Sequence, residues 1–280
     1  MKIDVILCAH NAERTIEDCV DSILNQTHEK FKLYIFEDAS TDNTLKILKT
    51  YRDPRIKIIA SERNIGTYAG KNFILNRFCS FSDYVALHDA DDYSHPERLE
   101  IQSKFLKENK AVCAGTGIIE FWEQGMQPWT KHSGEWIGNK RENFYPELIV
   151  RNDLKEILEY LKDEKQYSKY LKFKFCMNGS VMFKTSFLKS IGGWDGEARV
   201  AADTDIFIRT LAQNNIHNIQ QCLYYRRFHK NSLTARKDFG IKSDFRKEYN
   251  LARIPVVEKS LLGESVKRSF YHPSFKCRIY

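Results

Sequence analysis

The fold of this chain is most clearly indicated by residues 84–92, YVALHDADD. An apolar run of strand length ends here in three aspartates, Asp89, Asp91 and Asp92. Such a run is typical of a strand that is buried on both faces of a parallel sheet. Clustered carboxylates repel one another unless a cation or strong donors compensate, and hard oxygen ligands suit Mg²⁺ or Mn²⁺. The stretch therefore predicts a strand that ends at a divalent metal site, with an acidic helix N-cap as the alternative.

Strands and helices alternate through the rest of the first half. Apolar runs predict strands at 3–8, 33–36 and 56–59, and helical spacing of apolar residues predicts a helix at 16–24. Further helices are expected around Leu45, from about Tyr68, and from Pro96 to about Lys107. This alternation favours an α/β fold in which helices flank a mixed, mostly parallel sheet.

Polar residues follow each of the four predicted strands. They are His10 and Asn11, Glu37 and Asp38, Arg63 and Asn64, and Asp89 to Asp92. Because ligands of open α/β sheets bind at the carboxyl ends of the strands, these side chains are expected to converge on one crevice.

The second half is less regular. We expect a helix over 153–172, a return strand over 178–183, a helix over 202–211 and a strand over 221–226. A loop-rich segment is expected over 120–145, which contains Trp122, Trp129 and Trp136, and the chain beyond Lys237 reads as helical and basic.

Bulk properties narrow the class of protein. The 280 residues carry a net charge of +7, and residues 223–280 hold 14 Lys and Arg against 5 Asp and Glu. Such a stretch favours an anionic membrane face, a phosphorylated ligand or nucleic acid, or is a solvated helical surface. With no apolar run of about 18 residues and no leader pattern, we expect a cytoplasmic protein. Seven scattered cysteines without a CxxC pair indicate buried thiols rather than a zinc site or disulfides.

Two residues have a plausible role in binding a nucleotide. Asp38 follows the second strand, where an acid can bind a nucleoside base or ribose or can cap the next helix. A nicotinamide oxidoreductase is disfavoured because residues 9–14, AHNAER, contain no glycine. Lys71 is expected on the first turns of a helix, where it can pair with a diphosphate or remain a solvated surface lysine.

Four segments of the first half together resemble the inverting GT-A glycosyltransferases of family 2. They are the opening strand with its loop (VILCAHN, 5–11), EDASTD (37–42), NIGTYAGKN (64–72) and LHDADD (87–92). In the third segment Lys71 stands where the family has an arginine, so bidentate phosphate binding is lost.

The resemblance continues in the second half and covers roughly residues 3–235. IGGWD (191–195) looks like the acceptor loop, ADTDIFIR (202–209) like the helix with the catalytic base, and YRRFHKNS (225–232) like a late Y-R-x-H-x-x-S segment. Ala202 replaces the usual glutamate, which leaves Asp203 as the matching base. Residues 120–175 and 238–280 match nothing in the family pattern.

The resemblance also implies roles for particular residues. Asp203 would be the catalytic base, and Asp91 and His229 would bind Mn²⁺ or Mg²⁺, although His229 can equally be a satisfied histidine after a strand. Trp194 and Asp205 would contact the acceptor, although core packing is an equal alternative for Trp194. The donor would be bound by Ala9, His10, Asn11, Glu13, Asp38, Asn64, Gly66, Lys71, Asp89 and Ala90.

These expectations together describe a metal-dependent inverting glycosyltransferase. Its domain would span 1–237, with a nucleotide-binding half (1–110) and an acceptor-binding half (111–237), followed by a basic helical extension (238–280). The donor would be a UDP-sugar and the acceptor a glycan, a lipid-linked sugar or a protein, in surface polysaccharide or glycoconjugate synthesis. The basic extension adds peripheral membrane contact as an expectation, and no nucleic acid is expected. The alternatives are a non-catalytic sugar- or nucleotide-binding module and a sugar-phosphate nucleotidyltransferase.

Overall fold

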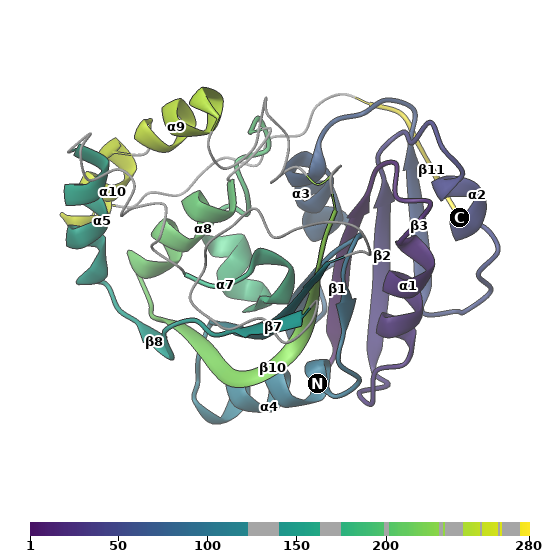
Figure 1. Ribbon diagram of the computed structural model, residues 1–280, viewed down its shortest axis with the longest axis horizontal. Helices are drawn as coiled ribbons and strands as arrows, with labels where there is room; N and C mark the ends of the chain where they lie inside the picture. Colours follow the sequence, from purple (N-terminus) through teal and green to yellow (C-terminus); the bar gives the residue numbers. More distant parts are fainter. Residues whose placement is uncertain are drawn as a thin grey trace.

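The computed structural model describes residues 1–122, 140–162, 175–198, 202–229, 232, 243–252, 254–262, 264 and 275–280. One mixed sheet runs through the molecule, and helices cover both of its faces (Figure 1). The predicted fold class is therefore confirmed. The loop-rich segment expected over 120–145 is wrong at its two ends, because β6 (Cys113–Trp122) and β7 (Lys140–Asn143) are strands, and residues 123–139 lie outside the described residues.

The first half of the sheet is parallel. β1 lies between β2 and β4, and β3 lies beyond β2. In register, Ala9 lies beside Glu37, and Cys8 lies beside Asp89. The carboxyl ends of these strands therefore meet at one edge of the sheet. Their bounds are Ile3–Ala9 for β1, Phe31–Glu37 for β2, Ile56–Ser61 for β3 and Tyr84–Asp89 for β4.

The second half of the sheet is joined to β4 through one short antiparallel strand, β9 (Met182–Lys184). Beyond it, β6 (Cys113–Trp122) and β10 (Ile216–Phe228) run parallel to each other. β10 also pairs with β5 (Tyr93–Ser94), which directly follows the acidic stretch. The end of β10 is thereby placed against residues 89–92. Two short strands complete this half: β7 (Lys140–Asn143) and β8 (Leu148–Ile149).

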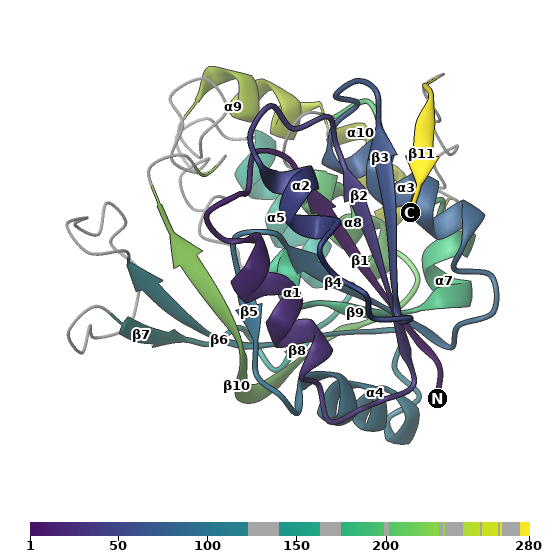
Figure 2. The same ribbon diagram turned by 90° about the vertical axis from the view of Figure 1, so that its right-hand side faces the viewer.

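Alternation along the strands divides the core between the two faces of the sheet. Val5 and Leu7 pack against α1, α2 and α4, whereas Ile6 and Phe36 belong to the apolar cluster that includes α3, α7 and α8 (Figure 2). The bounds are Ile16–Leu24 for α1, Thr44–Leu48 for α2, Thr67–Arg77 for α3, Arg98–Glu108 for α4, Thr185–Ser190 for α7 and Ala202–Leu211 for α8. Within the residues that the structure describes, no helix has the length and apolar character needed to cross a bilayer.

The C-terminal region differs from the helical extension expected at 238–280. It contains α9 (Asp244–Leu251) and α10 (Ile254–Leu261), and α10 packs against α5 (Asp153–Lys162) and α8. Residues Cys277–Ile279, however, form strand β11, which pairs antiparallel with β3 at the edge of the sheet. Backbone pairing along this edge overrides the helical tendency of the basic tail.

The return strand expected at 178–183 also differs from the structure. Residues Asn178–Ser180 form a 3₁₀ turn, η1, and the strand begins only at Met182. A glycine and two small polar residues make a strand start poorly determined, and the turn brings Gly179 close to Asp89.

Candidate active site

The carboxyl ends of β1, β2 and β3 are tied together around the main chain of Asp38. Its N–H donates to the Ala9 carbonyl oxygen at 2.8 Å. Its carbonyl oxygen lies 2.8 Å from Nδ1 of His10 and accepts from Nδ2 of Asn64 at 3.3 Å. The convergence expected from four polar strand ends therefore holds for these three strands.

The Asp38 carboxylate organises the loop before α3. One oxygen accepts the Ile65 N–H at 2.7 Å and the other accepts the Gly66 N–H at 2.8 Å. Gly66 has a φ of 91°, which a residue with a side chain rarely adopts. Asp38 is buried, so its carboxylate shapes the loop through these two backbone bonds.

Asn11 and Glu13 connect the loop after β1 to the loop after β2 through hydrogen bonds. Asn11 has a φ of 52°, and its Oδ1 accepts the Thr41 N–H at 2.8 Å. Oε2 of Glu13 accepts both the main-chain N–H and the side-chain amide of Asn43, at 3.0 and 2.9 Å. Both residues are exposed, and their bonds fix the shape of this rim.

Lys71 is a buried cation beneath this edge, not a surface lysine. It lies on the first turns of α3 with 1% of its side chain exposed. Its Nζ is 3.7 Å from Oδ1 of Asp89 and lies 5.9 Å from the centre of the Trp194 ring. A positive charge is thus held next to the first aspartate of the acidic stretch.

The acidic stretch, residues 89–92, lies at the end of β4. Burial raises the pKa of Asp89, the neighbouring carboxylates of Asp91 and Asp203 raise it further, and Lys71 opposes the shift. Burial also raises the pKa of Asp92, whose Oδ1 accepts the Arg227 N–H at 2.8 Å. Ala90 contributes its carbonyl oxygen, which accepts from the Thr15 hydroxyl at 2.9 Å. Negative charge is concentrated here, and a bound cation would relieve it.

Asp91 and His229, expected to bind metal, are brought together across 138 residues of sequence. Nε2 of His229 lies 2.9 Å from Oδ2 of Asp91, and the two side chains are 19% and 33% exposed. An accessible carboxylate and an imidazole are suitable donors for Mn²⁺ or Mg²⁺ that also binds phosphate oxygens and water. The described residues hold no group of three or more His, Cys, Asp or Glu that could hold a metal ion.

Asp203 is the first acid of α8. Its Oδ1 is buried without a hydrogen-bond partner, which leaves an acceptor unused. The charge of Asp203 is one of those that raise the pKa of Asp89.

Trp194 and Asp205 do not lie where an acceptor would touch them, which corrects the expectation for both. Trp194 is fully buried, and its main chain exchanges two hydrogen bonds with the Asn72 side chain. Asp205 is fully buried and pairs with Arg209 at 2.8 Å. Arg209 in turn donates to the carbonyl oxygens of Ile191 and Gly193. The turn at 191–194 is therefore a packing element that anchors α8.

Comparison with known proteins decides the family. Residues 4–192 match the sequence model described as Glycosyl transferase family 2. The chain belongs to this family. The resemblance seen in the motifs is thereby confirmed.

Two curated relatives illustrate the range of family 2 matches. The putative glycosyltransferase EpsE of Bacillus subtilis is 38% identical over 130 residues, which are 45% of this chain and 46% of EpsE. The O-antigen biosynthesis glycosyltransferase WbnJ of Escherichia coli is 30% identical over 237 residues, 82% of this chain and 81% of WbnJ. The chain spans less than half the length of the first curated relatives it matches.

Solved family-like structures share the GT-A fold. S. aureus TarS 1-349 in complex with UDP-GlcNAc has a TM-score of 0.63 at 19% identity, over 93% of this chain and 73% of that chain. The mannosyltransferase PcManGT from Pyrobaculum calidifontis, in complex with GDP-Man and Mn²⁺, has a TM-score of 0.57 at 15% identity, over 94% and 69%. At such identities the likeness shows the fold alone.

Sequence reasoning missed the residues that support the acidic stretch of this family 2 chain from below. The Tyr224 hydroxyl accepts the Asp89 N–H at 3.1 Å, and Arg98 lies under the Tyr224 ring at 5.0 Å. Arg98 is buried and donates to Gln102, to the Ser94 hydroxyl and to the Leu87 carbonyl oxygen. No sequence signal identified them, because an arginine at helical spacing reads as a solvated residue.

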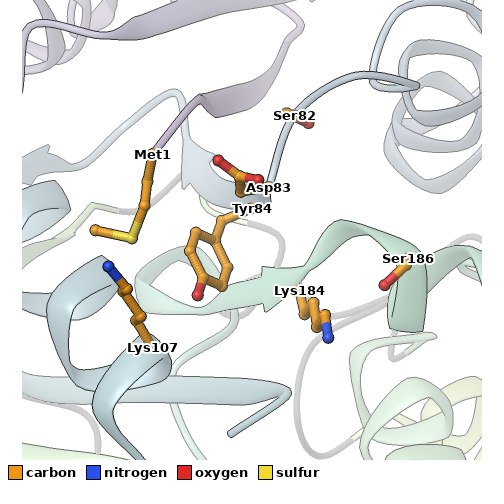
Figure 3. Close-up of a pocket in the computed structure, with 7 residues that line it drawn as sticks. All are labelled: Met1, Ser82, Asp83, Tyr84, Lys107, Lys184 and Ser186. Carbon is orange, nitrogen blue, oxygen red and sulfur yellow. The ribbon is translucent and has the colours of Figure 1, made fainter. Parts of the chain in front are cut away.

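The pocket in Figure 3 is separate from the family 2 site. Among the residues that line it are Met1, Asp83, Tyr84 and Lys107. Tyr84 begins β4 and Asp89 ends it, so this pocket lies at the opposite end of the strand from the acidic stretch.

Proposed function

We propose that this chain is a metal-dependent inverting glycosyltransferase that moves a sugar from a nucleoside diphosphate donor to a hydroxyl group. The observation that carries the proposal is the pairing of Asp91 with His229 in the acidic stretch, together with a carboxylate oxygen of Asp203 that has no hydrogen-bond partner among the described residues. Membership of family 2 supports the reaction class. WbnJ, named for O-antigen biosynthesis, supports surface polysaccharide or glycoconjugate synthesis as the setting.

The leaving group is the nucleoside diphosphate. A divalent ion held by Asp91 and His229 would stabilise its developing charge as a Lewis acid. Lys71 adds a fixed positive charge beside Asp89, where a diphosphate would benefit from it. The loops held by Asp38 and by Asn11 and Glu13 would enclose the nucleoside.

The incoming hydroxyl needs a base. Asp203 takes the acceptor proton as the acceptor oxygen forms its bond to C1 of the sugar. The bond from C1 to the phosphate oxygen breaks, and the nucleoside diphosphate leaves with that electron pair. Attack from the face opposite the diphosphate inverts the anomeric centre. The unpartnered Oδ1 of Asp203 suits this role because no donor in the described chain neutralises it.

UDP is the first nucleotide to test. TarS was solved with UDP-GlcNAc and PcManGT with GDP-Man, and these bound ligands support a nucleoside diphosphate sugar as the donor class. The acceptor is a glycan, a lipid-linked sugar or a protein, and the basic C-terminal region supports contact with an anionic membrane surface.

The test is a thermal-shift screen of UDP, GDP and dTDP with and without Mn²⁺, on the wild type and on Asp91→Ala. Ligands that bind the native state raise its melting temperature, so one nucleotide should stabilise the wild type more when Mn²⁺ is present. Asp91→Ala should lose the Mn²⁺-dependent part of the shift, whereas His28→Ala, at a half-buried histidine, should keep it.

A wild type with no Mn²⁺-dependent shift for any nucleotide would contradict metal dependence. Release of the nucleoside diphosphate from the corresponding nucleotide sugar then separates catalysis from binding alone. Binding without any release, including slow hydrolysis, would favour a non-catalytic module.

A further inference from the structure

Successive residues at and just after the end of β10 contact the acidic stretch and the strand that follows it. Tyr225, Arg227 and His229 alternate onto one side of the strand. The Tyr225 ring stacks on Tyr93, with ring centres 4.5 Å apart. Nε of Arg227 donates to the carbonyl oxygen of Asp91 at 3.0 Å, and His229 reaches the carboxylate of the same residue at 2.9 Å. Asp91 is therefore held at its main chain by Arg227, near the end of β10, and at its side chain by His229, just after that strand.

Arg227 is itself fixed from several directions. Its main-chain N–H donates to Oδ1 of Asp92 at 2.8 Å. Its Nη2 donates to Oδ2 of Asp18 on α1 at 2.7 Å, and its guanidinium lies 5.1 Å from the centre of the Phe121 ring. The side chain is 14% exposed, so these contacts are made in a largely dehydrated position. The rigid fork of an arginine can serve two acceptors at a fixed geometry, which a lysine cannot do.

These contacts have a consequence for a carboxylate that binds a cation. Asp89, Asp91 and Asp92 repel one another, which favours rotation of Asp91 away from its neighbours. The Arg227 bond to the Asp91 carbonyl fixes the main chain from which this side chain extends, and the charge of Arg227 offsets the repulsion. Residues that orient a metal ligand in this way commonly contribute about 10–100-fold in metal affinity.

We infer that Arg227 is a positioning residue for the metal site, which holds Asp91 beside His229 and is anchored to α1 by Asp18. The inference rests on the proposed function, because it assigns Arg227 a role toward the ion that Asp91 and His229 would bind. Arg227 does not touch the ion or the substrate in this role. It acts through Asp91.

The experiment measures Mn²⁺ affinity rather than turnover. Mn²⁺ is titrated into the purified chain at a saturating level of whichever of UDP, GDP and dTDP stabilises the wild type most, and free Mn²⁺ is followed by electron paramagnetic resonance. Arg227→Met should weaken Mn²⁺ binding about 10–100-fold while nucleotide binding without Mn²⁺ stays unchanged. Arg227→Lys should lie between Arg227→Met and the wild type.

Arg55→Met is the matched control. Arg55 also donates to a carboxylate at 2.7 Å, that of Asp53, and lies 4.7 Å from the centre of an aromatic ring, that of Phe31. It is far from the acidic stretch in the fold, so its loss should leave Mn²⁺ affinity at the wild-type value.

Each alternative outcome is distinct. Wild-type Mn²⁺ affinity in Arg227→Met would overturn the inference while leaving the proposed function intact. Wild-type affinity in Arg227→Lys alone would also overturn it, because charge and not position would then suffice. If Arg227→Met has no cooperative melting transition, Asp18→Asn decides, and unchanged Mn²⁺ affinity in that variant overturns the inference. A wild type without any Mn²⁺ response would refute the metal dependence of the proposed function itself.

Discussion

At the scale of single residues, the acidic stretch is balanced by two buried cations. Lys71 pairs with Asp89 from one side, whereas Arg98 lies below and, among the described residues, donates to the uncharged acceptors of Gln102, Ser94 and Leu87. Burial lowers the pKa of Arg98 to about 10, and the negative charges of Asp89 and Asp92 oppose that shift. Burial likewise lowers the pKa of His88 to about 3, so this histidine is neutral near pH 7. The side chains that pack beneath the carboxylates are therefore a neutral His88 and the cations Lys71 and Arg98. The two positive charges offset part of the repulsion between the carboxylates.

The unused acceptor on Asp203 gives a residue-scale prediction. Asp203→Asn keeps the shape of the side chain but cannot take a proton from an acceptor hydroxyl. We expect nucleotide-sugar turnover to fall about 10²–10⁴-fold, because general base catalysis contributes roughly that much. Nucleotide affinity with Mn²⁺ should stay near the wild-type value, as measured by calorimetry alongside nucleotide release.

Asp21→Asn is the control for Asp203→Asn. Asp21 is an exposed helical aspartate on α1 whose carboxylate accepts from the Tyr51 hydroxyl. Turnover should survive this change, and normal turnover in Asp203→Asn would remove Asp203 from the role of base.

At the scale of elements, η1 lets the chain pass unusually close to β4. A Cβ on Gly179 would lie 2.2 Å from the Tyr224 hydroxyl oxygen and 2.8 Å from Oδ2 of Asp89. Only a residue without a side chain fits between them. The turn therefore forms a wall behind Asp89, and its backbone limits where that carboxylate can go.

Gly179→Ala tests this wall. The added methyl group must displace Tyr224 or Asp89, and overpacking of this kind costs about 1–3 kcal/mol of unfolding free energy. We expect the loss of free energy of Mn²⁺-dependent nucleotide binding, measured by thermal shift, to exceed the loss of unfolding free energy, measured by denaturant unfolding. Adding Tyr224→Phe should not restore the stability, because Cζ of the ring stays 2.8 Å from the added methyl group and the Asp89 N–H loses its acceptor. A Gly179→Ala chain that binds nucleotide and Mn²⁺ normally would show that the wall does not constrain Asp89.

The sequence predicts some elements well and others poorly, for physical reasons. The sequence predicts β1, β4 and α8 because their continuous apolar runs or helical spacing are compatible with one type of secondary structure only. β6 was missed because Gly115 and Gly117 interrupt its apolar pattern, although each packs closely against neighbouring side chains. The start of β10 is not predicted because four of residues 216–221, IHNIQQ, are polar and the two isoleucines are three positions apart, which is not the spacing of two that a strand shows.

The same contrast holds for the candidate site. Asp91 and His229 follow strands and carry family motifs, so their meeting could be anticipated. Arg98, Tyr224 and Gly179 act through burial and close approach, which sequence spacing does not encode. The role of Trp194 is ambiguous in the sequence, because a large aromatic residue in a glycine-rich turn can stack on a sugar ring or pack in the hydrophobic core.

At the scale of the whole molecule, the C-terminal residues close the sheet. Tyr280 and Ile58 exchange two main-chain hydrogen bonds, at 2.8 and 3.0 Å, and the Lys49 ammonium lies 4.0 Å from the centre of the Tyr280 ring. β11 thus covers the free edge of β3, which would otherwise present unpaired N–H and carbonyl groups.

Deleting residues 276–280 should expose that edge. We expect unfolding free energy to fall by about 1–3 kcal/mol, since several hydrogen bonds of about 0.5–1.5 kcal/mol each are lost. Association between chains should also increase, as measured by light scattering on a sizing column. Arg278→Ala keeps the backbone pairing and should leave the association state unchanged. A deleted chain as stable and as dispersed as the full chain would show that β11 protects nothing.

The engagement of Asp38 has a consequence for redesign of the donor preference. Both carboxylate oxygens of Asp38 accept backbone N–H groups, those of Ile65 and Gly66. A substitution of Asp38 therefore loosens this loop and does not change the preference for one nucleobase. Asp38→Asn should weaken the binding of every nucleotide to a similar degree and should not change which nucleotide the chain prefers. A clean switch of base selectivity in that variant would mean that the carboxylate reads the base itself.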